Sequence, residues 1–559
     1  MALPDPDLLT RIPLSAHTVL HVGCTDGSLA AAYRPLNPRA RLLGVAGDPG
    51  DFASAASCYD EIVTAEALPG RLPFDTPDGI DCIVYDGSLE QSPDPWALLR
   101  AHAALLTDAG VLLIRARNRS HWRLTEALLR GAADPPMLAN PILAGPMLAG
   151  LDSDTMCREL EACGLYLADV VVREDKQDAA RRFAAAITPA LLTLGIDPEQ
   201  YRERCQGSHR IWRACKSPIR RLHISGSMLS PVGGVSHVRV VHPLEALKTD
   251  PSVHTSVTDR IEPRPADTPG IFVLHRPALM GERGTRLLTA LAEAGYVIVT
   301  EFDDHPDHFP MMRAGGELTF TGVHALQTST EPLAAELRKY NQEVAVFLNA
   351  LVSLPEPVNF IDPHAVTLFF GALNRENDWA PFMPVINDVA AMVGSRLRFQ
   401  VVHDQQFFAA LDTPHKSFTP TSDYETYQRL LAASEISFMP LSDTPFNRAK
   451  SDLKFIEAAS FRVAALASPI VYEDSIRHGE TGLVFRDAED LWQALMRLVD
   501  LPNYARRLAD NARRHVAAER MMAYQVSGRI AWYRSLWERR EVLEQERRKR
   551  LARYAGLVA

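Results

Sequence analysis

The 559-residue sequence has few cysteines, and they are unevenly placed. The seven cysteines are Cys24, Cys58, Cys82, Cys157, Cys163, Cys205 and Cys215. None is spaced as Cys-x-x-Cys, which argues against a zinc ribbon, and scattered cysteines are more typical of reduced core residues than of disulfides. Because none follows residue 215, we expect the chain to combine two parts of separate origin.

Long apolar runs and an excess of basic residues are also missing. No stretch reaches the ~18 uninterrupted apolar residues that a membrane helix needs. The first 16 residues lack the basic and then apolar segments of a signal peptide. We therefore expect a cytoplasmic protein with at most peripheral membrane association. The net charge of −10 argues against a nucleic-acid partner, but it still permits a local basic patch that holds phosphate.

What the sequence does contain is a repeated alternation of short apolar runs with helical patterns. Strands are predicted at residues 17–22, 41–46, 80–85 and 110–114, then at 222–225, 271–274 and 296–300, and finally at 366–370, 397–402 and 435–439. This alternation is typical of α/β domains with parallel sheets. Residues 176–218 are charged and helical in pattern, without a clear strand, and are predicted to be a helical connector.

A glycine-bearing turn, Gly23-Cys24-Thr25-Asp26-Gly27, follows the first predicted strand and leads into a helical pattern. Such a turn lets a ligand approach the backbone at a helix N-terminus, although structural turns of this type are common. Residues 17–130 resemble class I S-adenosylmethionine-dependent methyltransferases: VLHVGCTDGSLA stands where the family has its glycine-rich first motif, and residues 72–114 match its fourth and fifth strands. The resemblance implies a Rossmann-like fold. If S-adenosylmethionine binds, it implies contacts from Gly23, Asp26, Gly27, Asp48 and Glu66.

Two departures from the methyltransferase pattern concern activity. The family usually has an acidic residue at the end of the second strand, where it binds the ribose hydroxyls, and this chain has Ala46 there, with Asp48 two residues on. Close relatives have a Leu-Glu-His run after the fourth strand, and this chain has Gln91 in place of the histidine. We predict weak or absent S-adenosylmethionine binding, and a working methyltransferase remains the alternative.

A second glycine loop lies in the next α/β series, within residues 230–237. It contains Gly233 and Gly234, follows the strand at 222–225 and opens a helix. The two glycines would let the backbone approach a donor, and the helix N-terminus would favour its phosphate. An ordinary turn is the structural alternative.

The acidic run Glu301-Phe302-Asp303-Asp304-His305 follows the strand at 296–300, at the strand end where α/β sheets bind ligands. Asp303, Asp304 or His305 would be the catalytic base if an acceptor hydroxyl has to be deprotonated. A solvated loop that caps a helix is the structural alternative.

The third series carries groups suited to a diphosphate. The strand at 366–370 is followed by Gly371, Asn374 and Arg375, and a guanidinium there would bind diphosphate in a bidentate manner. If residues 450–459 are helical, Lys450, Lys454 and Glu457 share one face, with the lysines for phosphate and the glutamate for ribose hydroxyls. The same spacing also produces surface ion pairs.

Residues 222–535 resemble GT-B glycosyltransferases of the nucleotide-sugar-dependent, group-1-like kind. The motifs above occur in the family's order, and the turn His478-Gly479-Glu480-Thr481-Gly482-Leu483 resembles the turn that ends the donor domain. The resemblance implies two facing Rossmann-like domains, a nucleotide-sugar donor and no metal. It places the second motif glutamate of the retaining group at Glu457 but finds Ala449 where the first belongs, so the stereochemistry stays open.

We therefore predict an α/β chain with a methyltransferase-like domain (1–175), a helical connector (176–218), a GT-B acceptor domain (219–355), a GT-B donor domain (356–505) and C-terminal helices (506–559). The predicted function is sugar transfer from a nucleotide sugar to a hydroxyl of a surface glycan, a lipid-linked glycan or a protein. A methyltransferase that acts on a sugar or glycan and a non-catalytic glycan-binding scaffold are the alternatives. The sequence does not indicate an oligomeric state.

Overall fold

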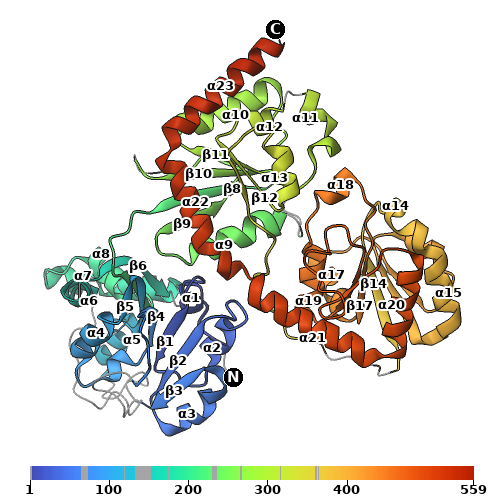
Figure 1. Ribbon diagram of the computed structural model, residues 1–559. Helices are drawn as coiled ribbons and strands as arrows, with labels where there is room; N and C mark the ends of the chain where they lie inside the picture. The colour runs from blue at the N-terminus through green and yellow to red at the C-terminus, as the bar shows by residue number, and fades with distance from the viewer. Residues whose placement is uncertain are drawn as a thin grey trace. The chain divides into compact units, whose positions relative to one another are not determined.

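The computed structural model describes residues 3–558 except 65–72, 119, 132–152, 174–176, 229–233, 235, 263, 265–266, 315–316, 359–361 and 363. Two compact units make up the chain (Figure 1). Unit 1 comprises Met1–Arg221 with Thr249–Ser252, and unit 2 comprises Leu222–Lys248 with Val253–Ala559. In the described part of the chain, no helix is long and apolar enough to cross a membrane.

Unit 1 is built on a seven-stranded sheet in the order β3-β2-β1-β4-β5-β7-β6. Its strands are β1 (Thr18–Val22), β2 (Arg41–Ala46), β3 (Glu61–Thr64), β4 (Ile80–Asp86), β5 (Leu106–Arg117), β6 (Tyr166–Arg173) and β7 (His209–Cys215). Its helices are α1 (Pro6–Leu9), α2 (Ser28–Tyr33), α3 (Pro49–Ala55), α4 (Pro95–Ala103), α5 (Trp122–Leu129), α6 (Ser153–Ala162), α7 (Gln177–Thr193) and α8 (Pro198–Cys205).

The first five strands of unit 1 are parallel and have the order 3-2-1-4-5 of a doubly wound sheet. β1 lies at the switch point, with Val19 opposite Leu42 of β2 on one side and Cys82 of β4 on the other. Apolar side chains of these central strands are buried in the core between sheet and helices, as expected for a parallel sheet covered on both faces.

The segment predicted as a helical connector is α7 and α8 followed by strand β7, so the expectation of no strand there is wrong. β7 runs antiparallel to both β5 and β6 and completes the unit 1 sheet. Its sequence, HRIWRAC, contains two arginines that hide the apolar pattern. Both are buried because they have partners: Arg213 pairs with Asp169, and Arg210 donates to the Glu203 and Arg204 carbonyl oxygens. The boundary between connector and domain remains a prediction.

Unit 2 contains two α/β halves, each with a six-stranded parallel sheet. In the first half, the strands are β8 (Leu222–Ser227), β9 (Val253–Val257), β10 (Gly270–His275), β11 (Val297–Glu301), β12 (Ala325–Thr328) and β13 (Val344–Val346). The helices are the π-helix η5 (His237–Val241), α9 (His242–Lys248), α10 (Gly281–Glu293), the 3₁₀ turn η6 (Pro306–His308), α11 (Pro310–Ala314), α12 (Leu318–Thr321) and α13 (Glu331–Leu337). In chain order the sheet runs 2-1-3-4-5-6, the flavodoxin-like form of a doubly wound sheet.

The second half has the Rossmann order 3-2-1-4-5-6. Its strands are β14 (Val366–Gly371), β15 (Leu397–Val402), β16 (Lys416–Thr419), β17 (Ile436–Met439), β18 (Ala464–Ala467) and β19 (Leu483–Val484). Its helices are α14 (Glu376–Trp379), α15 (Met383–Val393), α16 (Gln405–Ala410), α17 (Tyr424–Ala432), α18 (Pro445–Arg448), α19 (Leu453–Ser460) and α20 (Ala488–Asp500). The predicted fold class, a Rossmann-like N-terminal domain followed by two Rossmann-like domains, is confirmed.

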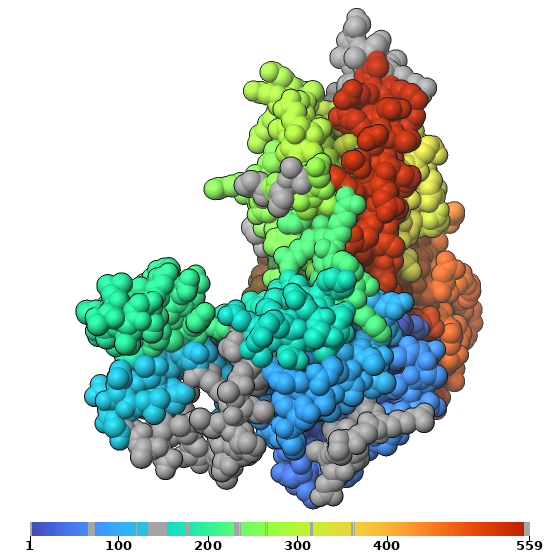
Figure 2. Space-filling model, turned by 90° about the vertical axis from the view of Figure 1, so that its left-hand side faces the viewer, coloured from blue at the N-terminus to red at the C-terminus, as the bar shows by residue number. Residues whose placement is uncertain are grey.

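The C-terminal helices divide between the two halves of unit 2. Helix α21 (Pro502–Glu519) packs on α19 and β18 of the second half. The chain then returns through η9 (Met522–Gln525) to the first half, where α22 (Val526–Glu538) contacts α9 and β10, and α23 (Arg540–Val558) contacts α12. Figure 2 shows these last helices, in red, running along the first half. The end of the chain therefore belongs structurally to both halves.

Candidate functional site

A cavity of about 210 Å³ lies at the carboxyl ends of β14 and β17. β14 pairs with β15 on one side and with β17 on the other, so the strand order of the second half reverses here. Ligands of open α/β sheets bind at this position. The residues that line the cavity come from both halves of unit 2 and are Val238, Arg239, Arg276, Asp303, Asn349, Phe370, Ala372, Arg375, Phe438, Met439, Pro440, Leu441, Lys450, Ser451, Leu453, Lys454 and Tyr472.

Lys454 lies on the first turn of α19 and reaches the end of β14. Its Nζ donates to the Gly371 carbonyl oxygen at 2.6 Å. Burial, followed by the positive charge of Arg375, lowers the pKa of Lys454 to about 8. Among the described residues, no carboxylate oxygen lies within 4.0 Å of this ammonium group. Lys454 is therefore a cation of the cavity that still lacks an anionic partner.

Lys450 also lines the cavity, but the predicted reason is wrong, because it does not belong to the helix of Lys454. Helix α18 ends at Arg448 and α19 begins only at Leu453. Residues 449–452 between these helices are not helical, and Asp452 is held there by Arg520 and Ser475. A bend, rather than a shared helical face, brings Lys450 and Lys454 to the same cavity.

Arg375 and Lys450 both lie against the Phe446 ring, at 5.9 Å and 4.1 Å from its centroid. Arg375 Nη1 donates to Asp378 at 3.0 Å and to the Asn447 side chain at 2.8 Å, which fixes its guanidinium. Burial lowers the pKa of Lys450, although Asp304 lies 3.4 Å from its Nζ and opposes the effect. Both cations are thus held beside the cavity by aromatic and acidic partners.

The other predicted positions after β14 differ in their roles. A Cβ atom on Gly371 would lie 2.6 Å from the Tyr427 ring and 2.7 Å from the Phe369 ring, so packing requires glycine at this position. Asn374 has a φ of 54° and is exposed, and it is not among the residues that line the cavity. Gly371 contributes its carbonyl oxygen to Lys454, whereas Asn374 only turns the chain.

Glu457 lies three residues after Lys454 on α19 and is buried. Its carboxylate accepts a short hydrogen bond from the Tyr424 hydroxyl. Burial raises the pKa of Glu457 to about 7, even though Tyr424 and Lys454 both favour its ionised form. Glu457 is not among the residues that line the cavity. A ligand in the cavity would have to extend past Lys454 to contact it.

The three candidate bases of the acidic run after β11 have different partners. Asp303 lines the cavity, with Arg276 Nε at 2.5 Å and His275 Nε2 at 3.5 Å. Burial alone would raise the pKa of Asp303, but His275 and Arg276 outweigh it and hold this pKa well below its usual range. Asp304 is the partner of Lys450. His305 is buried, and its Nδ1 accepts from the Asp307 amide as the cap of η6.

Residues 229–233 and 235 of the second glycine loop lie outside the described residues, and Gly233 is one of them. Gly234 is described, with a φ of 98° and open space where a side chain would be. The loop leads into a five-residue π-helix, η5, before α9. Single π-helical turns often occur at functional sites.

Sequence reasoning missed the buried ion pair between Arg239 of η5 and Glu301 at the end of β11. Arg239 Nε and Nη2 lie 2.9 Å and 3.0 Å from the two Glu301 oxygens, and both side chains are at most 2% exposed. Arg239 also donates to Asn349, and Gln327 donates to Glu301, each at 2.8 Å. The position of Glu301 at a strand end was visible in the sequence, but its arginine partner was not.

Arg276 was also missed. It follows β10 directly, lines the cavity and has a φ of 45°, an unusual backbone conformation for a residue with a side chain. Val471, next to the lining residue Tyr472, has a φ of 72°. Strained positions of this kind cluster at functional sites. A basic residue immediately after a predicted strand was the available signal for Arg276.

The cavity is lined by five cationic side chains, Arg239, Arg276, Arg375, Lys450 and Lys454. The first four have carboxylate partners, which are Glu301, Asp303, Asp378 and Asp304. Within the described residues there is no group of three or more histidine, cysteine or acidic side chains that could hold a metal ion. The arrangement can stabilise an anion with protein groups, and Lys454 is the cation most available to it.

In unit 1, the glycine turn is packed against side chains. A Cβ on Gly23 would lie 2.5 Å from Ser88 Cβ, and one on Gly27 would lie 2.7 Å from Cys58 Sγ. Asp26 accepts from the Ser28 amide at 3.0 Å. Asp48 caps α3 by accepting from the Gly50 and Asp51 amides, at 2.7 Å and 2.9 Å. Ala46 ends β2 and is fully buried, and Glu66 lies outside the described residues.

No known protein-family profile matches the sequence. The ubiquinone biosynthesis O-methyltransferases of Xanthomonas campestris pv. campestris (strain B100) and Xanthomonas euvesicatoria pv. vesicatoria (strain 85-10) are 29% identical over 112 residues and 28% identical over 113 residues. Each match covers 20% of this chain, in its N-terminal region, and the chain spans about half the length (47%) of these curated relatives.

Among solved structures, the chain is similar to a glycosyltransferase from Rickettsia africae ESF-5, which is 12% identical with a TM-score of 0.39, and the match covers 56% of this chain and 98% of that chain. Anabaena Alr3699/HepE in complex with UDP-glucose is 12% identical with a TM-score of 0.40, and the match covers 56% of this chain and 100% of that chain. TarM is 11% identical with a TM-score of 0.39, covering 47% of this chain and 54% of that chain. Both resemblances predicted from the sequence are thus also found by comparison with known proteins. The strand orders of the three sheets establish the fold independently.

Proposed function

We propose that unit 2 is a glycosyltransferase that moves a sugar from a nucleotide-sugar donor to a hydroxyl acceptor, and that the cavity at β14 and β17 binds the donor diphosphate. The observation that carries this proposal is the position of Lys454. Its ammonium group lines the cavity at the switch point and has no carboxylate within 4.0 Å among the described residues. An incoming phosphate would supply the missing partner.

The size of the cavity fits this assignment. Its volume of about 210 Å³ is below the roughly 300–1,000 Å³ of pockets that enclose a whole drug-sized ligand. The space therefore suits the diphosphate, with the nucleoside and the sugar extending beyond it. Glu457, beyond Lys454 on α19, is our candidate for the ribose hydroxyls, because an ionised carboxylate accepts two hydrogen bonds.

The proposed mechanism is stabilisation of the leaving diphosphate. When the bond to the sugar breaks, negative charge grows on the phosphate oxygens. Lys454, Lys450 and Arg375 would then act as fixed positive groups that need no reorganisation. Arg375 is fixed by Asp378 and Asn447, and Lys450 by Phe446 and Asp304. This set gives a divalent metal no required role.

The acidic run has a different proposed role from the one predicted. Asp303 is held ionised by Arg276 and His275, and Asp304 pairs with Lys450. We assign these carboxylates to positioning the cations rather than to taking a proton, and we assign His305 to the cap of η6. The acceptor class, whether a glycan, a lipid-linked glycan or a protein hydroxyl, is the same as that predicted from the sequence.

We also propose that unit 1 binds S-adenosylmethionine weakly or not at all. Ala46 supplies no ribose acceptor, and Asp48 Oδ1 already accepts from the Gly50 and Asp51 amides at the start of α3. Methyl transfer on a sugar would need that acceptor or a substitute for it.

The test is nucleoside diphosphate binding, measured by calorimetry on the full chain. Lys454→Ala should weaken binding by about 10- to 100-fold, as expected for the loss of a charge-assisted hydrogen bond worth about 1.5–3 kcal/mol. Lys339→Ala is the matched control, because Lys339 is an exposed lysine paired with Glu336. Equal affinities in both variants and the wild type would refute the assignment of the cavity.

A further inference from the structure

A second cavity in unit 2, about 560 Å³ in volume, is lined mainly by arginines. Four of them, Arg506, Arg507, Arg513 and Arg514, lie on α21, and Arg462 follows α19. The one acidic residue in the lining is Asp510. This cavity shares no lining residue with the cavity at β14 and β17, so the donor site does not account for it.

Part of this arginine cluster has a structural role. Arg462 forms a two-point ion pair with Asp510, which neutralises the acidic residue. Arg513 donates to the Ser460 carbonyl oxygen and, at 2.7 Å, to the Pro355 carbonyl oxygen. Burial lowers the pKa of Arg513, with Glu356 opposing this effect and Arg462 adding to it. These two arginines fasten α21 to α19 and to the segment that links the two halves.

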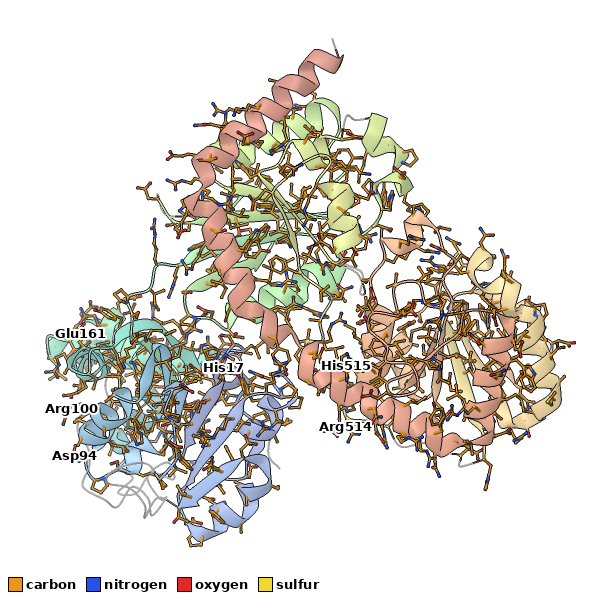
Figure 3. All side chains as sticks on the ribbon, viewed as in Figure 1. His17, Asp94, Arg100, Glu161, Arg514 and His515 are labelled. Atoms are coloured by element: carbon orange, nitrogen blue, oxygen red, sulfur yellow. The ribbon has the colours of Figure 1, made fainter. Side chains whose placement is uncertain are left out.

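The exposed arginines of the cluster have no comparable role. Arg507 and Arg514 are exposed, and neither has a carboxylate within 4.0 Å among the described residues. Arg507 lies over the Tyr504 ring at 5.1 Å, and Arg514 donates to Asn511 at 2.6 Å. Figure 3 labels Arg514 and His515 on α21. The His515 ring is near Phe455 of α19, at 6.5 Å, whereas Arg514 lines the open cavity.

The cluster carries an excess of positive charge. Its four arginines on α21 share a single carboxylate in the lining, Asp510, which lies three or four residues from each of them. This excess occurs on a chain with a net charge of −10. Arginine is also the side chain best suited to phosphate, because its planar group donates two parallel hydrogen bonds.

The spacing of the arginines defines the ligand further. Arg506 and Arg513, like Arg507 and Arg514, are seven residues apart, which is about two helical turns or roughly 10 Å along the axis. One phosphate group cannot contact both ends of that row. We propose that this cavity binds an anion with two or more phosphate groups, either a soluble oligophosphate or the headgroups of anionic phospholipids, at a site separate from the donor site.

The experiment measures the binding of inorganic tripolyphosphate to the full chain by titration calorimetry. Because the donor cavity should also bind tripolyphosphate, we expect two sites in the wild type. The double variant R507Q/R514Q should lose one of them, with at least tenfold weaker binding there, and should keep its affinity for a nucleoside diphosphate. The variant Lys454→Ala should lose the other site. R283Q/R286Q on α10 removes two exposed arginines elsewhere and should keep both sites.

Sedimentation with vesicles distinguishes the source of the phosphate. If phosphatidylglycerol vesicles, but not phosphatidylcholine vesicles, retain the wild type and release R507Q/R514Q, the ligand is a lipid headgroup. If only tripolyphosphate depends on these arginines, the ligand is soluble. The proposal is overturned if R507Q/R514Q binds tripolyphosphate and vesicles as the wild type and R283Q/R286Q do. If the wild type does not bind a nucleoside diphosphate, that result counts against the donor site alone.

Discussion

If Lys454 is the main phosphate contact, nucleoside diphosphate affinity should depend on alkaline pH in a predictable way. Its pKa is lowered to about 8, chiefly by burial. At that pKa, about 90% of free protein carries the ammonium form at pH 7 and about 10% at pH 9. A bound phosphate would hold the proton in place, so the affinity is nearly complete at about pH 7 and is lost progressively as the pH rises through the pKa of about 8. We expect about a tenfold weaker affinity at pH 9 than at pH 7.

Lys454→Arg is the decisive variant for this dependence. A guanidinium stays protonated throughout this range, so the variant should keep its affinity from pH 7 to pH 9. The assay is calorimetry at constant ionic strength, because surface charges are screened by salt. The affinity below about pH 7 is less informative about Lys454, because two other groups titrate there. The pKa of Glu457 is raised to about 7, and the ligand's own phosphate ionises near pH 6. If the wild type loses no affinity at alkaline pH, or if the Lys454→Arg variant loses as much as the wild type, Lys454 is not the main phosphate contact.

Because Ala46 replaces the ribose acceptor and Asp48 caps α3, calorimetry should show S-adenosylmethionine binding no tighter than about 100 µM; micromolar binding would contradict this. Because the cavity supplies its own cations, donor hydrolysis or transfer should persist in EDTA, and a complete loss that magnesium restores would make Asp303 and Asp304 metal ligands. Arg239→Met leaves Glu301 buried without its partner and should lower the free energy of unfolding by about 3–5 kcal/mol, measured by denaturant titration. Adding Glu301→Leu should recover part of that loss. No recovery would argue against the ion pair as the cause.

The central strands could be predicted from the sequence because they are continuous apolar runs. GIFVLH and VIVTE became β10 and β11, buried on both faces, and VTLFFG became β14. Strand β7 could not be predicted, since Arg210 and Arg213 interrupt its apolar pattern. Arg210 is satisfied by carbonyl oxygens of α8, and Arg213 by Asp169 of β6. Short edge strands such as β19, with two residues, have no periodicity to detect.

The site was partly predictable for the same reason. Lys454, Arg375 and Asp303 stand next to strand ends or strong motifs, and all three line the cavity. Arg239 lines it as well, but only the π-helix η5 and the distant Glu301 explain its position. Lys450 was chosen through a helical spacing that does not exist, because α18 ends at Arg448 and α19 begins only at Leu453. Pairings between distant residues decide these cases, and local patterns do not contain them.

The most direct measurement of the central claim is a crystal structure of the full chain with a nucleoside diphosphate. We expect a phosphate oxygen within about 3 Å of Lys454 Nζ, at the carboxyl ends of β14 and β17, with Lys450 and Arg375 on the same diphosphate and no metal ion between them. A diphosphate bound elsewhere in unit 2, while Lys454 still donates only to the Gly371 carbonyl oxygen, would contradict this expectation.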